Sequence, residues 1–152
     1  MNSIMNEYGV IGSLLIDSSL FPEAAGLPDQ AFSSPALQEV FRTMRRQYEG
    51  RGGFDALTVS VEARRNCPEV TDELLAQMMD ITPTTANLDA YIAAVKEEFL
   101  ARSLREIGAG LMEAEQAPLE ALGRVQDALQ RLTEENTRGD TDTLTDALVR
   151  LF

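Results

Sequence analysis

The 152-residue sequence contains no histidine and no tryptophan, a single cysteine and a single lysine. Without histidine there is no imidazole base and no histidine ligand for a metal, and one cysteine is too few for an ordinary zinc site. Because Cys67 is the single cysteine, an intramolecular disulfide is excluded, and no histidine is present to activate its thiol. These absences predict that the chain is not an enzyme by itself and that it holds no metal or cofactor.

Positive charge is scarce along the whole sequence. Thirteen basic residues stand against 25 acidic residues, which gives a formal net charge of −12. The residues up to Ala86 hold six basic and twelve acidic side chains, and the remainder holds seven and thirteen, so neither half is a basic arm. Because such a chain is repelled by a polyanion, we expect no tight autonomous binding of nucleic acid.

Long apolar runs and alternating patterns are also missing. No stretch approaches the roughly 18 apolar residues that cross a bilayer, and the N-terminus lacks the basic and apolar regions of a signal peptide. We therefore expect a cytoplasmic protein with no membrane contact. Since no period-two run is long enough for a sheet, the sequence predicts an all-α fold.

Helical periodicity begins close to the N-terminus. Residues 3–16 predict an amphipathic helix whose apolar side chains recur at spacings of four, three and four. The face consists of Ile4, Tyr8, Ile11 and Leu15. Gly9 and Gly12 lie on the flank of this face, and because glycine lowers helix propensity, they predict that another helix approaches closely there.

Besides a short helix around residues 22–25, three further helices are predicted before residue 86. Ser34 followed by Pro35 combines an N-cap with a proline at the first helical position, and the apolar stripe that follows ends at Gly50. Residues 56–65 and 72–81 are typical of two shorter helices. Together with the first helix they predict a small globular head.

The next helix carries two apolar stripes that are offset from each other. At 100° per residue, the apolar side chains of residues 88–99 cluster on one side, and those of residues 100–111 cluster about 120° further round. The first stripe is expected to pack on the head, and the second on a helix of residues 119–132. The sequence thus predicts an antiparallel hairpin, residues 87–136, that projects from a head, residues 1–86.

Two helices alone leave part of the hairpin's apolar surface in water. Each large apolar side chain left exposed forgoes about 1.5 to 3 kcal/mol, and a second hairpin would close the core into a four-helix arrangement. The candidate residues for this pairing are Leu104, Ile107, Leu111, Leu122 and Leu129. The alternative is that these side chains form only the internal core of a monomeric hairpin.

The last part of the sequence reads as a linker followed by a new helix. Residues 137–143 consist of threonine, arginine, glycine and aspartate, and the acidic run of Asp140, Asp142 and Asp146 does not fit a calcium-binding loop. Thr143 with Asp146 matches a capping pattern, so residues 144–152 predict the start of an amphipathic linker helix. The apolar residues expected to dock this helix on a partner are Leu144, Leu148 and Leu151.

Four blocks along the chain carry a family resemblance. Residues 7–17 contain a Gly-Ser-Leu-Leu core that is followed by an acid, and residues 32–44 form a second helical block. Residues 53–59 include Gly-Phe-Asp followed by Thr-Val, and residues 82–97 begin with Thr-Pro-Thr-Thr-Ala-Asn. In order and spacing these blocks resemble the N-terminal domain of replicative DNA helicases of the DnaB type, over nearly the whole chain.

The resemblance implies a collar in which hairpins of neighbouring subunits pair, as dimers or trimers of dimers, above a ring of motor domains. It also implies that the collar binds primase and helicase loaders, and that residues 144–152 dock on an adjacent motor domain. ATP and Mg are expected in that motor domain, which this sequence lacks. We interpret the chain as the oligomerisation and partner-docking domain of a hexameric helicase in DNA replication; the alternative is a free-standing phage-type adaptor or inhibitor that binds a helicase ring.

Overall fold

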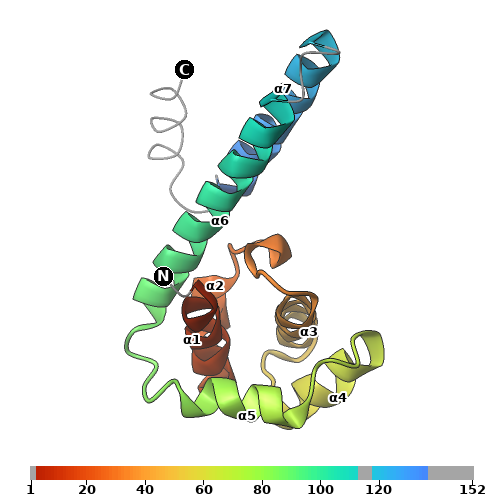
Figure 1. The fold of residues 1–152 in the computed structure, drawn as a ribbon. Coiled ribbons are helices and arrows are strands. Elements are labelled where there is room, and N and C mark those ends of the chain that lie inside the picture. The colour runs from red at the N-terminus through yellow and green to blue at the C-terminus, as the bar shows by residue number, and fades with distance from the viewer. Residues whose placement is uncertain (1–2, 113–117, 137–152) are drawn as a thin grey trace. The chain divides into compact units, whose positions relative to one another are not determined.

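The structure, a computed structural model, describes residues 3–112 and 118–136. Within these ranges the chain forms α-helices and short 3-10 turns but no strand, so the predicted all-α class is confirmed (Figure 1). The chain divides into two compact units, Met1–Phe99 and Leu100–Phe152. The division falls where the sequence predicts that the apolar face of the long helix changes sides.

The elements follow one another in a simple order. The α-helices of unit 1 are α1 (Ser3–Ile16), α2 (Phe21–Ala24), α3 (Pro35–Arg51), α4 (Ala56–Asn66), α5 (Asp72–Asp80) and the first part of α6 (Leu88–Met112). Two 3-10 turns, η1 (Ser18–Leu20) and η2 (Asp29–Ala31), flank α2. Helix α7 (Pro118–Asn136) belongs to unit 2. The predicted helices 3–16, 56–65 and 72–81 agree with α1, α4 and α5 to within one residue.

Helix α3 begins and ends through local signals that the sequence contains. The hydroxyl of Ser34 accepts a hydrogen bond from the amide of Leu37 at 3.2 Å, and Pro35 occupies the first helical position. Gly52 terminates the helix with φ of 76°, a left-handed conformation that glycine adopts without strain. Helix α3 therefore extends one residue past its predicted end at Gly50.

Helix α4 starts with a reciprocal capping box. The carboxylate of Asp55 accepts from the backbone amide of Thr58 at 2.8 Å, and the Thr58 hydroxyl accepts from the amide of Asp55 at 3.1 Å. The hydrogen bond from that backbone amide is the main reason that the pKa of Asp55 lies below its ordinary value. The start of α4 is thus fixed by short-range hydrogen bonds.

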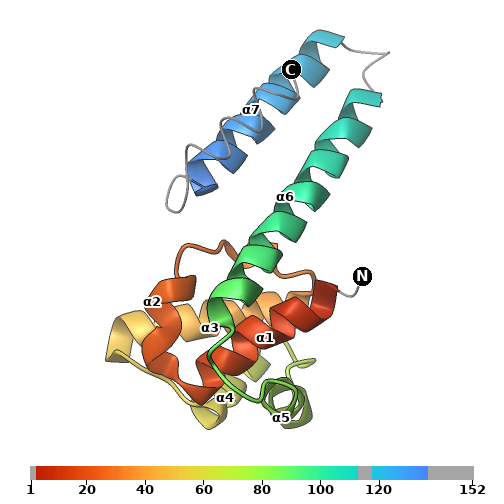
Figure 2. The same ribbon diagram turned by 90° about the vertical axis from the view of Figure 1, so that its left-hand side faces the viewer.

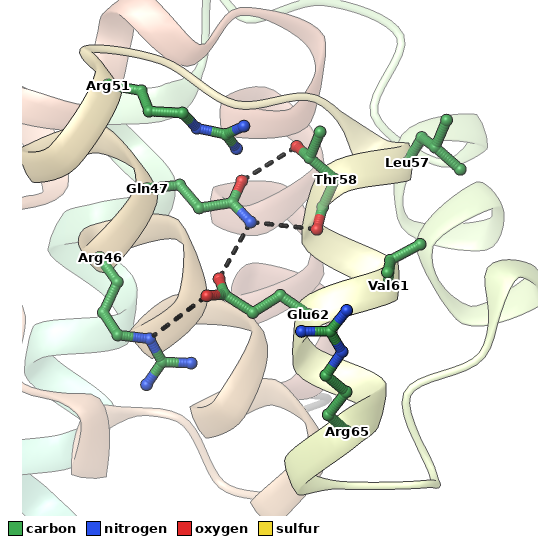
Figure 3. A pocket seen from close by; sticks show the side chains of 8 residues that line it. All are labelled: Arg46, Gln47, Arg51, Leu57, Thr58, Val61, Glu62 and Arg65. Carbon is green, nitrogen blue, oxygen red and sulfur yellow. Dashed lines mark hydrogen bonds and ion pairs between the residues drawn. The ribbon is translucent and has the colours of Figure 1, made fainter.

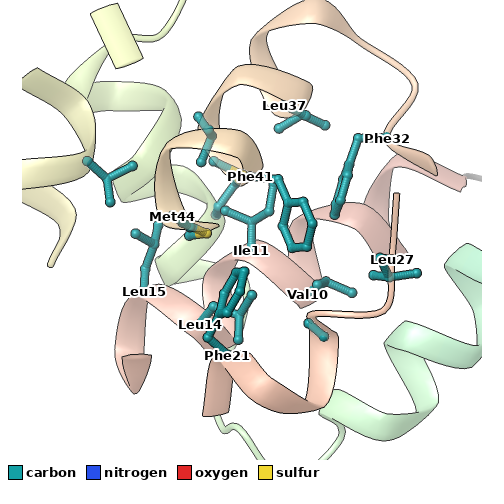
Figure 4. Close-up of a cluster of buried hydrophobic side chains, with 14 of the residues drawn as sticks. Val10, Ile11, Leu14, Leu15, Phe21, Leu27, Phe32, Leu37, Phe41 and Met44 are labelled. Atoms are coloured by element: carbon teal, nitrogen blue, oxygen red, sulfur yellow. The ribbon is translucent and has the colours of Figure 1, made fainter. Parts of the chain in front are cut away.

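The core of unit 1 is built around aromatic rings (Figure 4). The ring of Phe21 lies 5.5 Å from that of Phe41 and 5.3 Å from that of Tyr48, and Phe54 meets it edge-on at 6.0 Å. Arg45 places its guanidinium carbon 5.1 Å from the centroid of the Phe41 ring. The other large, fully buried side chains include Ile11, Leu14, Leu27, Phe32, Leu37 and Met44.

The first part of α6 belongs to this core. Leu88, Ile92 and Val95 are buried, and all three are members of the hydrophobic cluster that α1 and α3 also supply. Tyr91 and Phe99 pack against the same cluster and are partly buried. The prediction that the first stripe of the long helix packs on the head is confirmed.

Both glycines of α1 stand where another element comes close, as the sequence predicts. A Cβ atom on Gly12 would overlap the backbone carbonyl of Met78, in α5, and the hydroxyl of Thr82. A Cβ atom on Gly9 would lie 2.6 Å from the nearest ring carbon of Tyr91. Glycine at position 12 allows α1 to pack directly on α5, beside which it lies in Figure 2, and glycine at position 9 leaves room for the Tyr91 ring of α6.

Unit 2 contains the second part of α6 and all of α7. The two helices run side by side in opposite directions in both views (Figures 1 and 2). The turn between them, residues 113–117, and the segment from residue 137 onward lie outside the described residues. The antiparallel hairpin predicted from the two stripes is therefore observed in the helices themselves.

Candidate interaction surfaces

Helix α7 has one apolar face that the chain covers itself. Ala121, Val125 and Leu132 are buried, with exposed fractions of 2%, 8% and 6%. Their spacings of four and seven place them on one side of the helix.

The chain covers only part of the apolar stripe of α7. By helical spacing this stripe consists of Leu119, Leu122, Val125, Leu129 and Leu132. Leu119 and Leu122 are instead 83% and 50% exposed, and Leu129 is half-buried. The periodicity defines a broad apolar sector, and the structure divides it into a covered side with Ala121, Val125 and Leu132 and an open side with Leu119 and Leu122.

The end of α6 adds to the exposed apolar surface of unit 2. Leu111 is 43% exposed and Met112 is 82% exposed, whereas Leu104 and Ile107 are half-buried. We use the name open leucine surface for Leu111, Met112, Leu119 and Leu122. Of the five residues predicted for hairpin pairing, Leu111 and Leu122 belong to this set, and Leu104, Ile107 and Leu129 are half-buried. Ala121 was missed by the sequence prediction, although its spacing of four from Val125 was a usable signal.

A second candidate surface lies in unit 1, in a groove of about 470 Å³ between α3 and α4 (Figure 3). We call it the α3–α4 groove. Helix α3 supplies Arg46, Gln47 and Arg51, and helix α4 supplies Leu57, Thr58, Val61, Glu62 and Arg65. The lining combines three guanidinium groups with one carboxylate, an excess of two positive charges in a chain of net charge −12.

Hydrogen bonds between the two helices fix the floor of the groove. The side-chain amide of Gln47 donates to the backbone carbonyl of Thr58 and to the carboxylate of Glu62, both at 3.0 Å. The Thr58 hydroxyl donates back to the Gln47 carbonyl at 2.9 Å, and Arg46 lies 4.0 Å from Glu62 (Figure 3). The single carboxylate of the groove is therefore already engaged by groups of the chain itself.

Glu39 joins α3 to α4 beside this groove. Its buried carboxylate accepts from Asn66 at 2.9 Å, from Arg46 at 3.1 Å and from Arg42 at 2.6 Å. Burial of the carboxylate raises the pKa of Glu39, but these three hydrogen bonds together outweigh it and hold the pKa below its ordinary value. Glu39 is thus an ionised structural group and not a proton carrier near neutral pH.

Two further features were sought in the described part of the chain. Among residues 3–112 and 118–136, no three histidine, cysteine, aspartate or glutamate side chains gather closely enough to hold a metal ion. No helix in the same residues combines the length and the apolar character of a membrane span. The predicted docking residues Leu144, Leu148 and Leu151 lie outside the described residues.

The described residues form a small all-α domain with an exposed apolar surface and a groove lined mainly by arginines. The profile of the family "DnaB-like helicase N terminal domain" matches residues 1–97. The chain belongs to this family of DnaB-like helicase N-terminal domains. The resemblance found in the four sequence blocks is thereby confirmed.

Individual relatives agree with the family. The chain is 28% identical to the replicative DNA helicase DnaB of Rhodothermus marinus over 140 residues, 87% of this chain. It is 30% identical to the replicative DNA helicase DnaB of Geobacillus stearothermophilus over 108 residues, 67% of this chain. These alignments cover only 15% and 23% of the length of the two helicases.

A solved structure shows the same fold. The crystal structure of the N-terminal domain of DnaB helicase from Mycobacterium tuberculosis matches with a TM-score of 0.73 and 27% identity. The match covers 82% of this chain and 94% of that chain. The chain is therefore similar in extent to that N-terminal domain and much shorter than the whole helicases.

Proposed function

We propose that this chain is the oligomerisation and partner-docking domain of a hexameric replicative helicase, with hairpins of neighbouring copies paired through unit 2. Family membership supports the link to a helicase, since both curated relatives are replicative DNA helicases. The observation that carries the pairing is the open leucine surface. The four large apolar side chains of this surface are exposed in a single copy of the chain.

The second part of the proposal is that the domain binds partner proteins. A collar of paired hairpins presents several copies of unit 1 side by side, and such a surface is suited to binding a primase or a helicase loader. The linker helix expected at residues 144–152, with Leu144, Leu148 and Leu151, would join the collar to the motor domain. ATP and Mg would act in that motor domain and not in this chain.

Leu111→Asp together with Leu122→Asp is the direct test of hairpin pairing. Each lost apolar contact costs about 1.5 to 3 kcal/mol, so we expect the dissociation constant of the oligomer to rise by about a hundredfold or more. Size-exclusion chromatography with light scattering measures the mass. Because both side chains are largely exposed, the helical signal in circular dichroism should persist.

A matched control is available on the other side of α7. Arg124→Gln with Arg131→Gln also lowers the net charge by two, but both arginines are exposed and lie opposite Leu122 on the helix. This control should keep the oligomeric mass of the parent chain. A parent chain that stays monomeric at high micromolar concentration, or an unchanged mass for the leucine double variant, would rule out pairing through this surface.

The reading frame after the codon for Phe152 tests whether the parent protein contains a motor domain. A downstream Gly-x-x-x-x-Gly-Lys-Ser or Gly-Lys-Thr loop would bind nucleotide phosphates and identify the motor domain. A stop codon would instead favour the free-standing adaptor or inhibitor that binds a helicase ring. Reading that frame decides between these two proposals without any assay.

A further inference from the structure

The positive charge of unit 1 is concentrated on two adjacent helices. All six basic side chains among the first 86 residues lie on α3 or α4. They are Arg42, Arg45, Arg46, Arg51, Arg64 and Arg65. The twelve acidic side chains of the same 86 residues are instead spread from Glu7 to Asp80. The α3–α4 pair is therefore the place on unit 1 where an acidic ligand meets the least repulsion.

Four of the six arginines are engaged in the structure of unit 1. Arg42 and Arg46 bond the buried carboxylate of Glu39, at 2.6 and 3.1 Å. Arg45 donates to two backbone carbonyls after α2, at 3.1 and 2.8 Å. Arg64 pairs with a carboxylate at the start of α5 at 2.7 Å. Removal of any of these four would disturb the fold as well as the surface charge.

Arg51 and Arg65 are different, because neither makes an ion pair with another described residue. Arg51 faces the carboxylate of Asp55 more distantly and lowers its pKa, but that carboxylate is already bonded to the capping amide of α4. A helix dipole favours an arginine near the C-terminal end of α3 or α4. The dipole does not explain why the exposed apolar side chains of Leu57 and Val61 line the same groove as the two arginines.

Two aliphatic side chains of α4 complete the surface. Leu57 is 71% exposed and Val61 is 47% exposed, and with Arg65 they follow one another at spacings of four along one face of the helix. In Figure 3 the side chains of Leu57 and Val61 lie on the side of α4 that faces away from α3, and Arg51 extends from α3 toward α4. The lining of the α3–α4 groove thus combines two exposed aliphatic side chains with two guanidinium groups that make no ion pair with another described residue.

We propose that the α3–α4 groove binds an acidic amphipathic peptide segment of a partner protein. Carboxylates of the segment would pair with Arg51 and Arg65, which are suited to bidentate contacts with carboxylate groups. Aliphatic side chains of the segment would cover Leu57 and Val61. A groove volume of about 470 Å³ falls within the range of ligand-binding clefts.

The chemistry of the lining favours a peptide over single-stranded nucleic acid. Proteins that bind single strands stack bases on aromatic side chains, and no aromatic residue lines this groove. The net charge of −12 makes long-range attraction of a polyanion unfavourable, whereas a short acidic peptide is bound by local pairing.

Fluorescence anisotropy with the 152-residue chain tests the proposal. The probe is a fluorescein-labelled peptide of about 15 residues, alanine-rich, with glutamate and leucine on one helical face. We expect saturable binding that weakens by about tenfold or more in Arg51→Glu/Arg65→Glu. Leu57→Ser should weaken binding by about threefold or more, because it removes the largest exposed aliphatic contact.

Three controls make the result decisive. Arg124→Glu with Arg131→Glu changes the net charge equally but lies on exposed positions of α7, and it should bind the probe like the parent chain. A peptide with glutamine in place of glutamate should bind at least about tenfold more weakly. Circular dichroism should show the same helical content for all variants, since the substituted side chains are exposed.

Four outcomes would overturn the proposal. They are the absence of saturable binding of the acidic peptide, equal binding of the glutamine peptide, equal losses in the α7 control variant, and tighter binding of an oligothymidylate at the same groove. The last outcome would make the groove a nucleic-acid site. Because the groove lies in unit 1 and the open leucine surface in unit 2, failure here leaves the oligomer-mass test of hairpin pairing unaffected.

Discussion

Gly12→Ala is expected to lower the free energy of unfolding by about 3 kcal/mol or more. The added Cβ would overlap the backbone carbonyl of Met78 and the Thr82 hydroxyl, which already donates to that carbonyl at 2.8 Å. Because the obstacle is helix backbone and not the end of a flexible side chain, α1 and α5 must move apart. Overpacking of this kind costs about 1–3 kcal/mol and occasionally more.

Urea unfolding followed by circular dichroism measures this loss, with two other glycines for comparison. Gly9→Ala meets only the ring of Tyr91, a partly buried side chain that can turn, and should cost less than Gly12→Ala. Gly50→Ala meets nothing within 4 Å in α3 and should leave stability unchanged or raise it by up to about 1 kcal/mol. Equal effects of all three substitutions would contradict the close packing of α1 on α5.

Glu39→Ala is expected to cost about 2–3 kcal/mol of unfolding free energy, because it removes charge-assisted hydrogen bonds that join α3 to α4. Asn66 loses its carboxylate partner, and Arg42 and Arg46 lose an anion at 2.6 and 3.1 Å. Glu39→Gln keeps the size of the side chain and should cost less. Chemical unfolding at neutral pH separates the two variants, and a loss below about 0.5 kcal/mol for Glu39→Ala would contradict the structural role.

The pH dependence of stability provides an independent test of the contribution that the ionised Glu39 carboxylate makes to folding. Since its folded pKa is lowered, Glu39 contributes stability that is fully present above its ordinary pKa of 4.5 and is lost as pH falls through the lowered value. In Glu39→Gln the free energy of unfolding should therefore fall less steeply as the pH is lowered; we call this fall at low pH the acid limb. Part of the limb should remain, because the pKa values of Asp55 and Asp72 are lowered as well. An acid limb identical to that of the parent chain would show that Glu39 is not a titrating contributor.

Most of the helices follow from signals within a few residues. The Ser34–Pro35 pair, for example, begins α3 through one side-chain bond and one fixed backbone angle, and both are visible in the sequence. The two glycines of α1 predicted a close helix, although they could not tell that α5 and Tyr91 would be the neighbours. Local chemistry thus fixes where helices begin, whereas partners depend on the packing of the whole unit.

The candidate surfaces were harder to predict. Periodicity places Leu122 and Val125 in one apolar sector of α7, but only tertiary packing decides that Val125 is covered and Leu122 is half exposed. The α3–α4 groove combines positions from two helices, so no single window of sequence contains it. A usable signal was the confinement of all six arginines of the first 86 residues to positions 42–65.

The aromatic core of unit 1 also determines what optical methods can observe. The chain has no tryptophan, and its three tyrosines, Tyr8, Tyr48 and Tyr91, all lie in unit 1. Tyrosine emission therefore reports on that unit alone, with Tyr48 sensing the ring of Phe21 on which it stacks. Far-ultraviolet dichroism records the helices of both units. A denaturation curve that differs between the two signals would resolve melting of the hairpin from melting of the core, without any added label.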